Sequence, residues 1–270
     1  MALRRYLQDA LIGTAAVVVA GAHLVPGSDT PGPVMSAAVS FVKGDSTAHS
    51  AVTEGVAGAL STSITTALSA FANTVRPLSH PRALEDAFRS YFAYKAAHPG
   101  EVKKPLLYFV DYGLPSTTPR GYVFDMDAQK IVDGPFTVAH GRGSSSTQYG
   151  VPTRFANAMG AATSSLGLYV AQETYAFHGH AGGQEYSSVG LRLMGVSGNY
   201  NDKARARGVV AHGAPYVTPA KAGRSEGCPA MEQSRAQRLL PKLANGAMVF
   251  LFAPDSTWMS GDPWVAAGAE

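Results

Sequence analysis

The residues best suited to chemistry are the single cysteine of this 270-residue chain and a histidine sixteen positions before it. Val209, Val210 and Ala211 form an apolar run that ends at His212, which predicts a strand that delivers an imidazole to the edge of a core. Prolines and glycines fill the stretch between His212 and Cys228, which predicts a shaped loop that folds the two side chains together.

A thiol attacks carbonyl groups as its thiolate, and at a reference pKa of ~8.5 it is mostly protonated at neutral pH unless a base or cation lies beside it. His212 is the candidate base, and the glycine before Cys228 lets a substrate carbonyl approach backbone N–H groups as an oxyanion hole. These residues predict acyl transfer through a thioester. The alternative is a structural cysteine and a structural histidine, but Cys228 has polar and turn-forming neighbours rather than apolar ones.

The sequence His212-Gly213, a loop and then Ser225-x-Gly227-Cys228 resembles the active-site signature of the L,D-transpeptidases of bacterial peptidoglycan, which have the YkuD-type fold. The likeness covers about residues 80–256 and points to the branch called the murein L,D-transpeptidase catalytic domain family. The other segments that carry it are Gly121–Met126, Val138–Gly141, Pro152–Asn157, Ser164–Val170, Glu173–Tyr175, Asn201–Asp202 and Gly223–Ser225.

The resemblance implies that Cys228 attacks the carbonyl at the L,D bond of a donor stem peptide and that His212 takes the thiol proton and returns it to the leaving amine. It also implies that the backbone carbonyl of Gly213 holds the imidazole, and that the N–H groups of Gly227 and Cys228 stabilise the oxyanion.

Tyr216, Arg224 and Ser225 are the expected substrate contacts. Many relatives carry Arg or Asn two places after the cysteine, where this chain has Ala230, so Arg224 is expected to supply the positive charge instead.

No metal or organic cofactor is expected. His178 and His180, with His212 and Cys228, are zinc-ligand types, but a Gly-rich His-x-His lacks a second closely spaced pair. A role for His178 or His180 along the substrate cleft stays open, and His140 is expected to shape a loop.

These features predict an exported cysteine acyltransferase that acts on peptidoglycan stem peptides and forms L,D cross-links. Two alternatives stay open. Water in place of an acceptor amine would give an L,D-carboxypeptidase or endopeptidase, and a chain that kept the fold without the chemistry would be a catalytically idle wall-binding module.

Charge bears on the partners. The net charge is +3, the pI is about 8.9 and charged residues make up 15% of the chain. Lysines and arginines are scattered without the basic stripe that nucleic-acid binding requires, so no nucleic-acid partner is expected. A mild positive charge suits an anionic wall polymer, and a monomer is expected.

The N-terminus predicts export to the periplasm or cell envelope. Arg4 and Arg5 precede an apolar run from Ala10 to Ala22, which is typical of a secretory signal. An uncleaved membrane anchor over residues 1–22 stays open, because the run is slightly shorter than the ~18–20 apolar residues that span a bilayer.

Domain boundaries follow from composition. Residues 23–78 are rich in Ala, Ser, Thr and Gly and predict a flexible linker, with at most a loose helix over 51–72. The catalytic domain is expected over 79–258 and a C-terminal tail over 259–270. Within the domain, helical spacing predicts helices over 84–95 and 231–244.

The fold class is expected to be mainly β: a single YkuD-like, sandwich or barrel-like domain with a few flanking helices. Short β-type runs separated by glycine and proline carry this prediction. They are Leu106–Tyr112, Gly121–Met126, Ile131–Ala139, Leu166–Gln172, Val189–Met194, Gly208–Ala211 and Met248–Phe252.

Overall fold

A computed structural model describes residues 46–267 of the chain. The chain divides into two units, residues 1–57 and 58–270, and the second unit holds the sheet and the candidate site. The predicted signal or anchor over residues 1–22 lies outside the described residues. Among the helices that are described, none is both long enough and apolar enough to span a bilayer.

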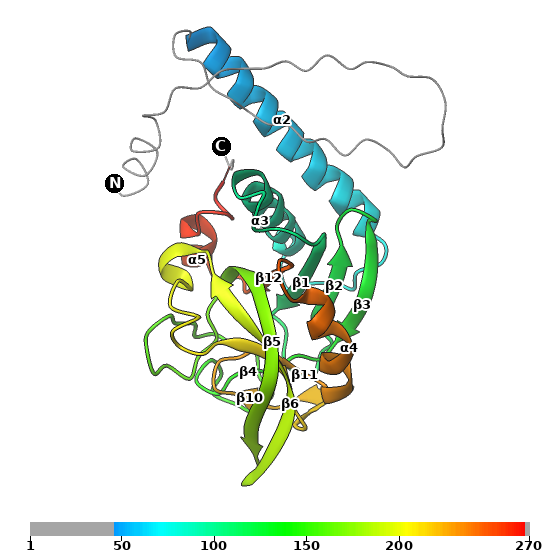
Figure 1. The fold of residues 1–270 in the computed structure, drawn as a ribbon, viewed down its shortest axis with the longest axis vertical. Coiled ribbons are helices and arrows are strands. Elements are labelled where there is room, and N and C mark those ends of the chain that lie inside the picture. Colours follow the sequence, from blue (N-terminus) through cyan, green and yellow to red (C-terminus); the bar gives the residue numbers. More distant parts are fainter. Residues whose placement is uncertain (1–45, 268–270) are drawn as a thin grey trace. The chain divides into compact units, whose positions relative to one another are not determined.

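One eight-stranded sheet forms the centre of the second unit (Figure 1). Its order is β11-β7-β6-β5-β12-β1-β2-β3, with parallel pairing at β11–β7 and β1–β12 and antiparallel pairing elsewhere. The strands are β1 (Leu106–Asp111), β2 (Gly121–Asp125), β3 (Lys130–Phe136), β5 (Gly167–Ala181), β6 (Gln184–Gly195), β7 (Val210–Gly213), β11 (Ala230–Met231) and β12 (Met248–Phe252). The predicted mainly-β class is confirmed, as one open sheet.

Short strand pairs flank this sheet. β4 (His140–Gly141) pairs in parallel with β10 (Arg224–Ser225), and β8 (Val217–Thr218) pairs with β9 (Lys221–Ala222). The helices are α2 (Ser46–Phe71), α3 (Ala83–Ala97), α4 (Gln233–Leu243) and α5 (Ser256–Gly261), with a 3-10 turn η1 (Gly198–Tyr200).

Helices cover both faces of the sheet. Successive residues of a strand point to opposite faces, so each face presents its own set of side chains to a helix. On one face Phe109 packs near Phe124, which in turn meets Phe88 of α3. On the other face Tyr108 stacks on Phe136, and Arg235 of α4 lies over that same ring. The helix predicted over 231–244 is therefore α4, packed on the sheet.

Residues 23–78 were predicted to be a flexible linker, and this prediction is wrong for residues 58–78. Ile64, Ala67 and Phe71 of α2 are buried, and the Phe71 ring lies 4.7 Å from that of Phe124. The low helix propensity of Ser, Thr and Gly is overridden here by the packing of an apolar stripe.

The predicted tail over 259–270 is also part of the fold as far as it is described. Val265 is fully buried, and the Trp264 indole donates to the Val196 carbonyl at 2.6 Å. The Asp262 carboxylate accepts hydrogen bonds from the Trp258 indole and from the Trp264 amide, each at 2.9 Å. These contacts tie the segment to the sheet through α5.

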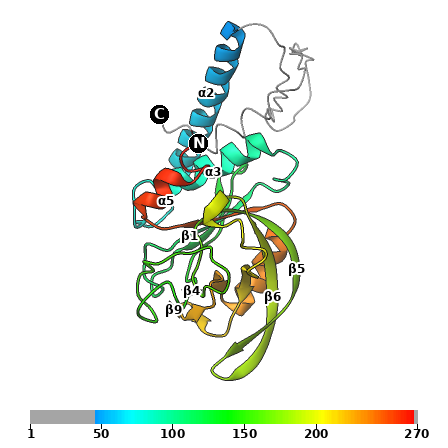
Figure 2. The same ribbon diagram turned by 90° about the vertical axis from the view of Figure 1, so that its left-hand side faces the viewer.

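β5 and β6 are much longer than the sequence pattern predicts. They continue past the rest of the sheet as a curved two-stranded arm, which we call the β5–β6 arm (residues 174–189; Figures 1 and 2). A register shift between Ala171 and Thr174 marks where the arm begins. β6 also pairs with β7, which places the base of the arm beside His212.

Candidate active site

Two neighbouring strands bring the predicted pair together. His212 lies in β7, in register with Ala230 of β11, and its amide donates to the Pro229 carbonyl at 3.3 Å. Cys228 lies two residues before β11, so the turn that carries the sulfur runs alongside β7. The cysteine is half-buried, whereas the His212 side chain is almost fully buried.

The His212 imidazole is fixed from two sides. Its Nδ1 lies 3.1 Å from the carbonyl oxygen of Gly213, and its ring stacks on Phe177 of the β5–β6 arm at 4.1 Å and 18°. A carbonyl can only accept, so Nδ1 carries the proton and Nε2 is left as a proton acceptor. Burial lowers the pKa of His212 to about 4, which keeps the ring neutral at pH 7.

The Cys228 sulfur contacts the start of β7. It lies 3.9 Å from the Gly208 carbonyl and accepts a hydrogen bond from the Val210 amide. The described side chains of Cys228 and His212 share no hydrogen bond in this arrangement. Burial raises the pKa of the Cys228 thiol, while the Val210 amide and the Arg207 guanidinium oppose that rise.

The turn before the sulfur is held by Ser225, which was expected to contact substrate. The buried Ser225 hydroxyl accepts from the Gly227 amide at 3.1 Å and donates to the Cys228 carbonyl at 2.7 Å. Ser225 therefore braces the turn from within. The Gly227 amide, one of the two expected oxyanion donors, is engaged by that hydroxyl.

Gly227 cannot be replaced without strain. Its φ is 130°, and a side chain there would lie 2.7 Å from the Thr163 carbonyl oxygen. The Gly227 carbonyl accepts from the Ser164 hydroxyl at 3.1 Å. The loop that precedes β5 thus packs directly against the cysteine turn.

The other two expected substrate contacts lie in different settings. Arg224 is exposed, and its guanidinium is 3.5 Å from the carbonyl oxygens of both Arg142 and Ser145. Tyr216 is half-buried and meets Tyr186 of the β5–β6 arm edge-on at 6.4 Å. Both remain candidates for substrate contact.

The remaining histidines lie apart from this pair. His178 lies 3.1 Å from the Ser187 hydroxyl and His180 lies 3.3 Å from Glu185, all on the exposed arm. Within the described part of the chain, no three metal-ligating side chains of the His, Cys, Asp and Glu types are grouped for an ion.

His140 is buried in β4, where Nδ1 lies 2.9 Å from the Arg120 guanidinium. An arginine can only donate, so Nδ1 accepts and the His140 proton is on Nε2. Burial, with the charges of Arg120 and Arg224, lowers the pKa of His140 to about 3. This histidine is a neutral structural group within β4, the strand that pairs with Arg224 and Ser225 of β10.

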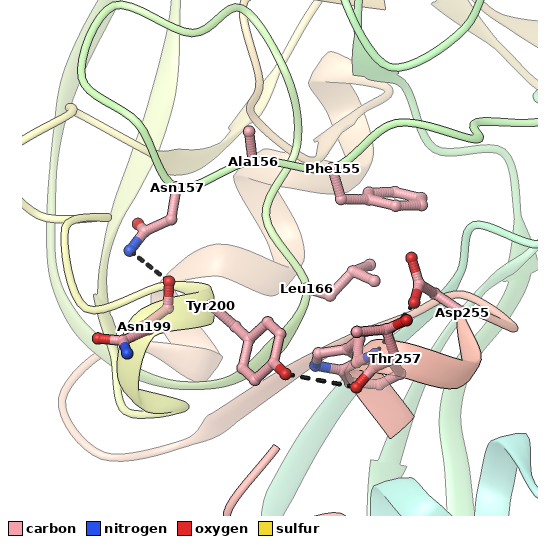
Figure 3. A pocket seen from close by; sticks show the side chains of 9 residues that line it. Phe155, Ala156, Asn157, Leu166, Asn199, Tyr200, Asp255 and Thr257 are labelled. Carbon is pink, nitrogen blue, oxygen red and sulfur yellow. Dashed lines mark hydrogen bonds between the residues drawn. The ribbon is translucent and has the colours of Figure 1, made fainter. Parts of the chain in front are cut away.

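A hollow of about 230 Å³ lies between the 155–166 loop, η1 and α5 (Figure 3). Phe155, Leu166, Tyr200 and Trp258 give it apolar walls, and Asn157 donates to the Asn199 carbonyl at 2.9 Å at its edge. None of the expected site residues lines it. The loop that walls this hollow is the one that backs the cysteine turn.

Two residues of the site were missed by sequence reasoning. Phe177 lies beyond the predicted end of its strand, and the alternation of Tyr175 and Phe177 with small or polar residues was the signal that could have extended it. Arg207 has no local pattern that marks it, because its partners are backbone carbonyls of a distant loop.

The fold and the site define a class of protein: an open sheet in which the strand that carries His212 lies beside the turn that carries Cys228. The chain belongs to the L,D-transpeptidase catalytic domain family, whose model matches residues 77–252. The match confirms the resemblance carried by the His-Gly and Ser-x-Gly-Cys signature. No curated protein sequence matches the chain.

Solved structures similar to this chain include L,D-transpeptidases from three bacteria. The protein from Mycobacterium smegmatis is 12% identical, with 55% of this chain and 59% of that chain covered and a TM-score of 0.34. The one from Stackebrandtia nassauensis is 16% identical, with 63% and 66% covered and a TM-score of 0.34. One from Mycobacterium tuberculosis is 15% identical, with 55% and 57% covered and a TM-score of 0.31. This chain thus spans less than two thirds of the first of these proteins.

Proposed function

We propose that this protein is a cysteine-dependent L,D-transpeptidase that cross-links peptidoglycan stem peptides. The observation that carries this is the contact between His212 Nδ1 and the Gly213 carbonyl, because it leaves Nε2 free as a base on the strand beside Cys228. Family membership supplies the substrate class.

The first half of the reaction makes a thioester. Rotation of the Cys228 side chain about its Cα–Cβ bond turns the sulfur from Gly208 toward His212, whose Nε2 takes the thiol proton. The sulfur then bonds to the carbonyl carbon at the L,D bond of a donor stem peptide. The C–N bond breaks, and His212 returns the proton to the departing amine of the terminal D-residue.

The second half consumes the thioester. An acceptor amine loses a proton to His212 as it bonds to the same carbonyl carbon, and the C–S bond breaks to regenerate the thiol. The Cys228 amide is the oxyanion donor that we favour, because the Gly227 amide is occupied by Ser225. Tyr216 and Arg224 are proposed to contact the stem peptide.

The substrate lies outside the cytoplasmic membrane, so this function requires export. We propose that residues 1–22 provide the signal or anchor and that the protein works in the periplasm or cell envelope as a monomer, without a metal or organic cofactor.

Mass spectrometry of the products tests the function. Purified protein incubated with disaccharide-tetrapeptides is expected to release the terminal D-residue and yield cross-linked dimers, and Cys228→Ser is expected to yield none because its hydroxyl is far harder to deprotonate. A carbapenem is expected to add its mass at Cys228. Hydrolysed monomers alone would indicate a carboxypeptidase, and unchanged substrate with no adduct would indicate an idle wall-binding module.

A further inference from the structure

Arg207 is anchored entirely to neutral groups. Its guanidinium donates to the carbonyls of Ala156 at 2.9 Å, Ala161 at 3.1 Å and Thr163 at 2.8 Å, and to the Ser165 hydroxyl at 3.3 Å. Arginine keeps its proton throughout the physiological pH range. These contacts hold the group rigidly while leaving its positive charge in place.

No carboxylate of the described residues forms an ion pair with Arg207. Arg205, two positions earlier on the same turn, instead pairs with Glu173 at 3.0 Å. The two arginines therefore differ in kind: Arg205 is exposed and paired, whereas Arg207 is half-buried and keeps its full charge.

That charge lies directly behind the nucleophile. The Arg207 Nη2 is 3.7 Å from the point where a side chain at Gly227 would begin, and the Thr163 carbonyl that it binds is 2.7 Å from the same point. The residue after Arg207, Gly208, presents its carbonyl to the sulfur at 3.9 Å. The guanidinium thus backs the Gly227–Cys228 peptide.

The other titratable groups around the sulfur do not supply a positive charge. Glu226 is exposed and held by Arg142 at 2.7 and 2.8 Å. His212 is neutral at pH 7, because burial lowers its pKa to about 4. Four tyrosines also surround the sulfur, and burial raises their pKa values, so they stay uncharged; they are Tyr112, Tyr175, Tyr186 and Tyr216.

We propose that Arg207 is a positioning residue of the acyl-transfer site, where its fixed charge stabilises the Cys228 thiolate and the oxyanion that follows it. The role rests on the proposed function for its use in catalysis. A neutral imidazole can accept the thiol proton but brings no standing charge to the sulfur. A positive charge nearby lowers the pKa of an acidic group by about one unit or more. For a thiol, this raises the fraction present as thiolate at neutral pH about tenfold.

The rate of Cys228 alkylation by iodoacetamide, measured against pH, tests this without any substrate. Arg207→Gln keeps hydrogen-bond donors but removes the charge, and its alkylation is expected to fall about tenfold at pH 7 and to recover as the pH rises. Arg207→Lys keeps the charge but not the fork of donors, and its profile is expected to stay near that of the wild type. Arg205→Gln, with the same change in net charge, is the matched control and is expected to behave as wild type.

A purely structural Arg207 gives a different result: both variants lose thermal stability and neither moves the alkylation profile. That outcome would overturn the role. If Arg207→Gln does not fold, the wild type can be tested alone. A cation beside the sulfur attracts anionic iodoacetate. The ratio of the alkylation rate with iodoacetate to the rate with iodoacetamide is therefore expected to be severalfold higher for Cys228 than for N-acetylcysteine. An equal ratio would refute the role. If Arg207→Gln shifts the alkylation profile but the wild type does not cross-link stem peptides, the proposed function is refuted, whereas the effect of Arg207 on the Cys228 thiolate is retained.

Discussion

His212 is held by two contacts with different consequences. The Gly213 carbonyl sets which nitrogen carries the proton, whereas the Phe177 ring fixes the plane of the imidazole and excludes water from one face. In the proposed mechanism, a base held in this orientation loses little conformational freedom when it takes a proton from Cys228, and this raises the rate. The depressed pKa of His212 follows from the same enclosure.

Removing the ring at position 177 tests this enclosure. In Phe177→Leu the imidazole is more exposed, so the pKa of His212 is expected to rise from about 4 toward 6.5, and turnover is expected to fall by about two- to tenfold, the scale of one aromatic contact. Titration of the His212 ring protons by NMR measures the pKa. Phe177→Tyr keeps the ring and should restore both values, and His178→Ala on the opposite face of the arm is the control. An unchanged titration would show that Phe177 does not tune the histidine.

At the residue scale, the sequence predicts that His212 and Cys228 lie close together, but it does not predict which side chains surround them. His212, Gly213 and Cys228 carry a local signature, so their proximity could be predicted. The inward turn of Ser225 and the stacking of Phe177 depend on how strands far apart in sequence meet, which no local pattern encodes.

Among the elements, α2 shows how packing overrides composition. Leu60, Ile64, Ala67, Leu68 and Phe71 recur at helical spacing, but many serines, threonines and glycines separate them. The stripe forms a helix because its end packs on Phe88 of α3 and on Phe124 of β2. The β12 run was predicted at its observed bounds because it is a short, wholly buried strand.

Truncating Phe71 tests whether α2 belongs to the fold. Phe71→Ala is expected to lower the free energy of unfolding by about 3–5 kcal/mol, the usual cost of a large buried ring. Thr66→Ala, at an exposed position of the same helix, is expected to change it by less than about 0.5 kcal/mol. Urea denaturation of both variants measures the difference. Equal stabilities would restore the view of this segment as a linker.

For the whole molecule, burial of ionisable groups couples folding to pH. His212 and His140 are held neutral inside the fold, with pKa values lowered to about 4 and about 3. Buried carboxyls act in the opposite direction, because burial raises the pKa of Asp111 and Asp262. The pH dependence of the overall stability combines the effects of the buried histidines and the buried carboxyls. The contribution of one histidine is therefore measured by comparing variants.

Between pH 4 and 6.5 the unfolded chain binds a proton at His212 that the folded protein does not, so the histidine makes stability rise with pH across this window and leaves it flat above. Replacing His212 by Gln removes that contribution. The wild type is expected to gain up to about 1.4 kcal/mol per pH unit more than His212→Gln over this window. Urea denaturation at several pH values from 4.5 to 7.5 measures the two slopes, with His178→Gln, an exposed histidine of the arm, expected to follow the wild type. Parallel slopes for wild type and His212→Gln would mean that His212 is not buried as a neutral base, and the acid–base role given to it would fail with that result.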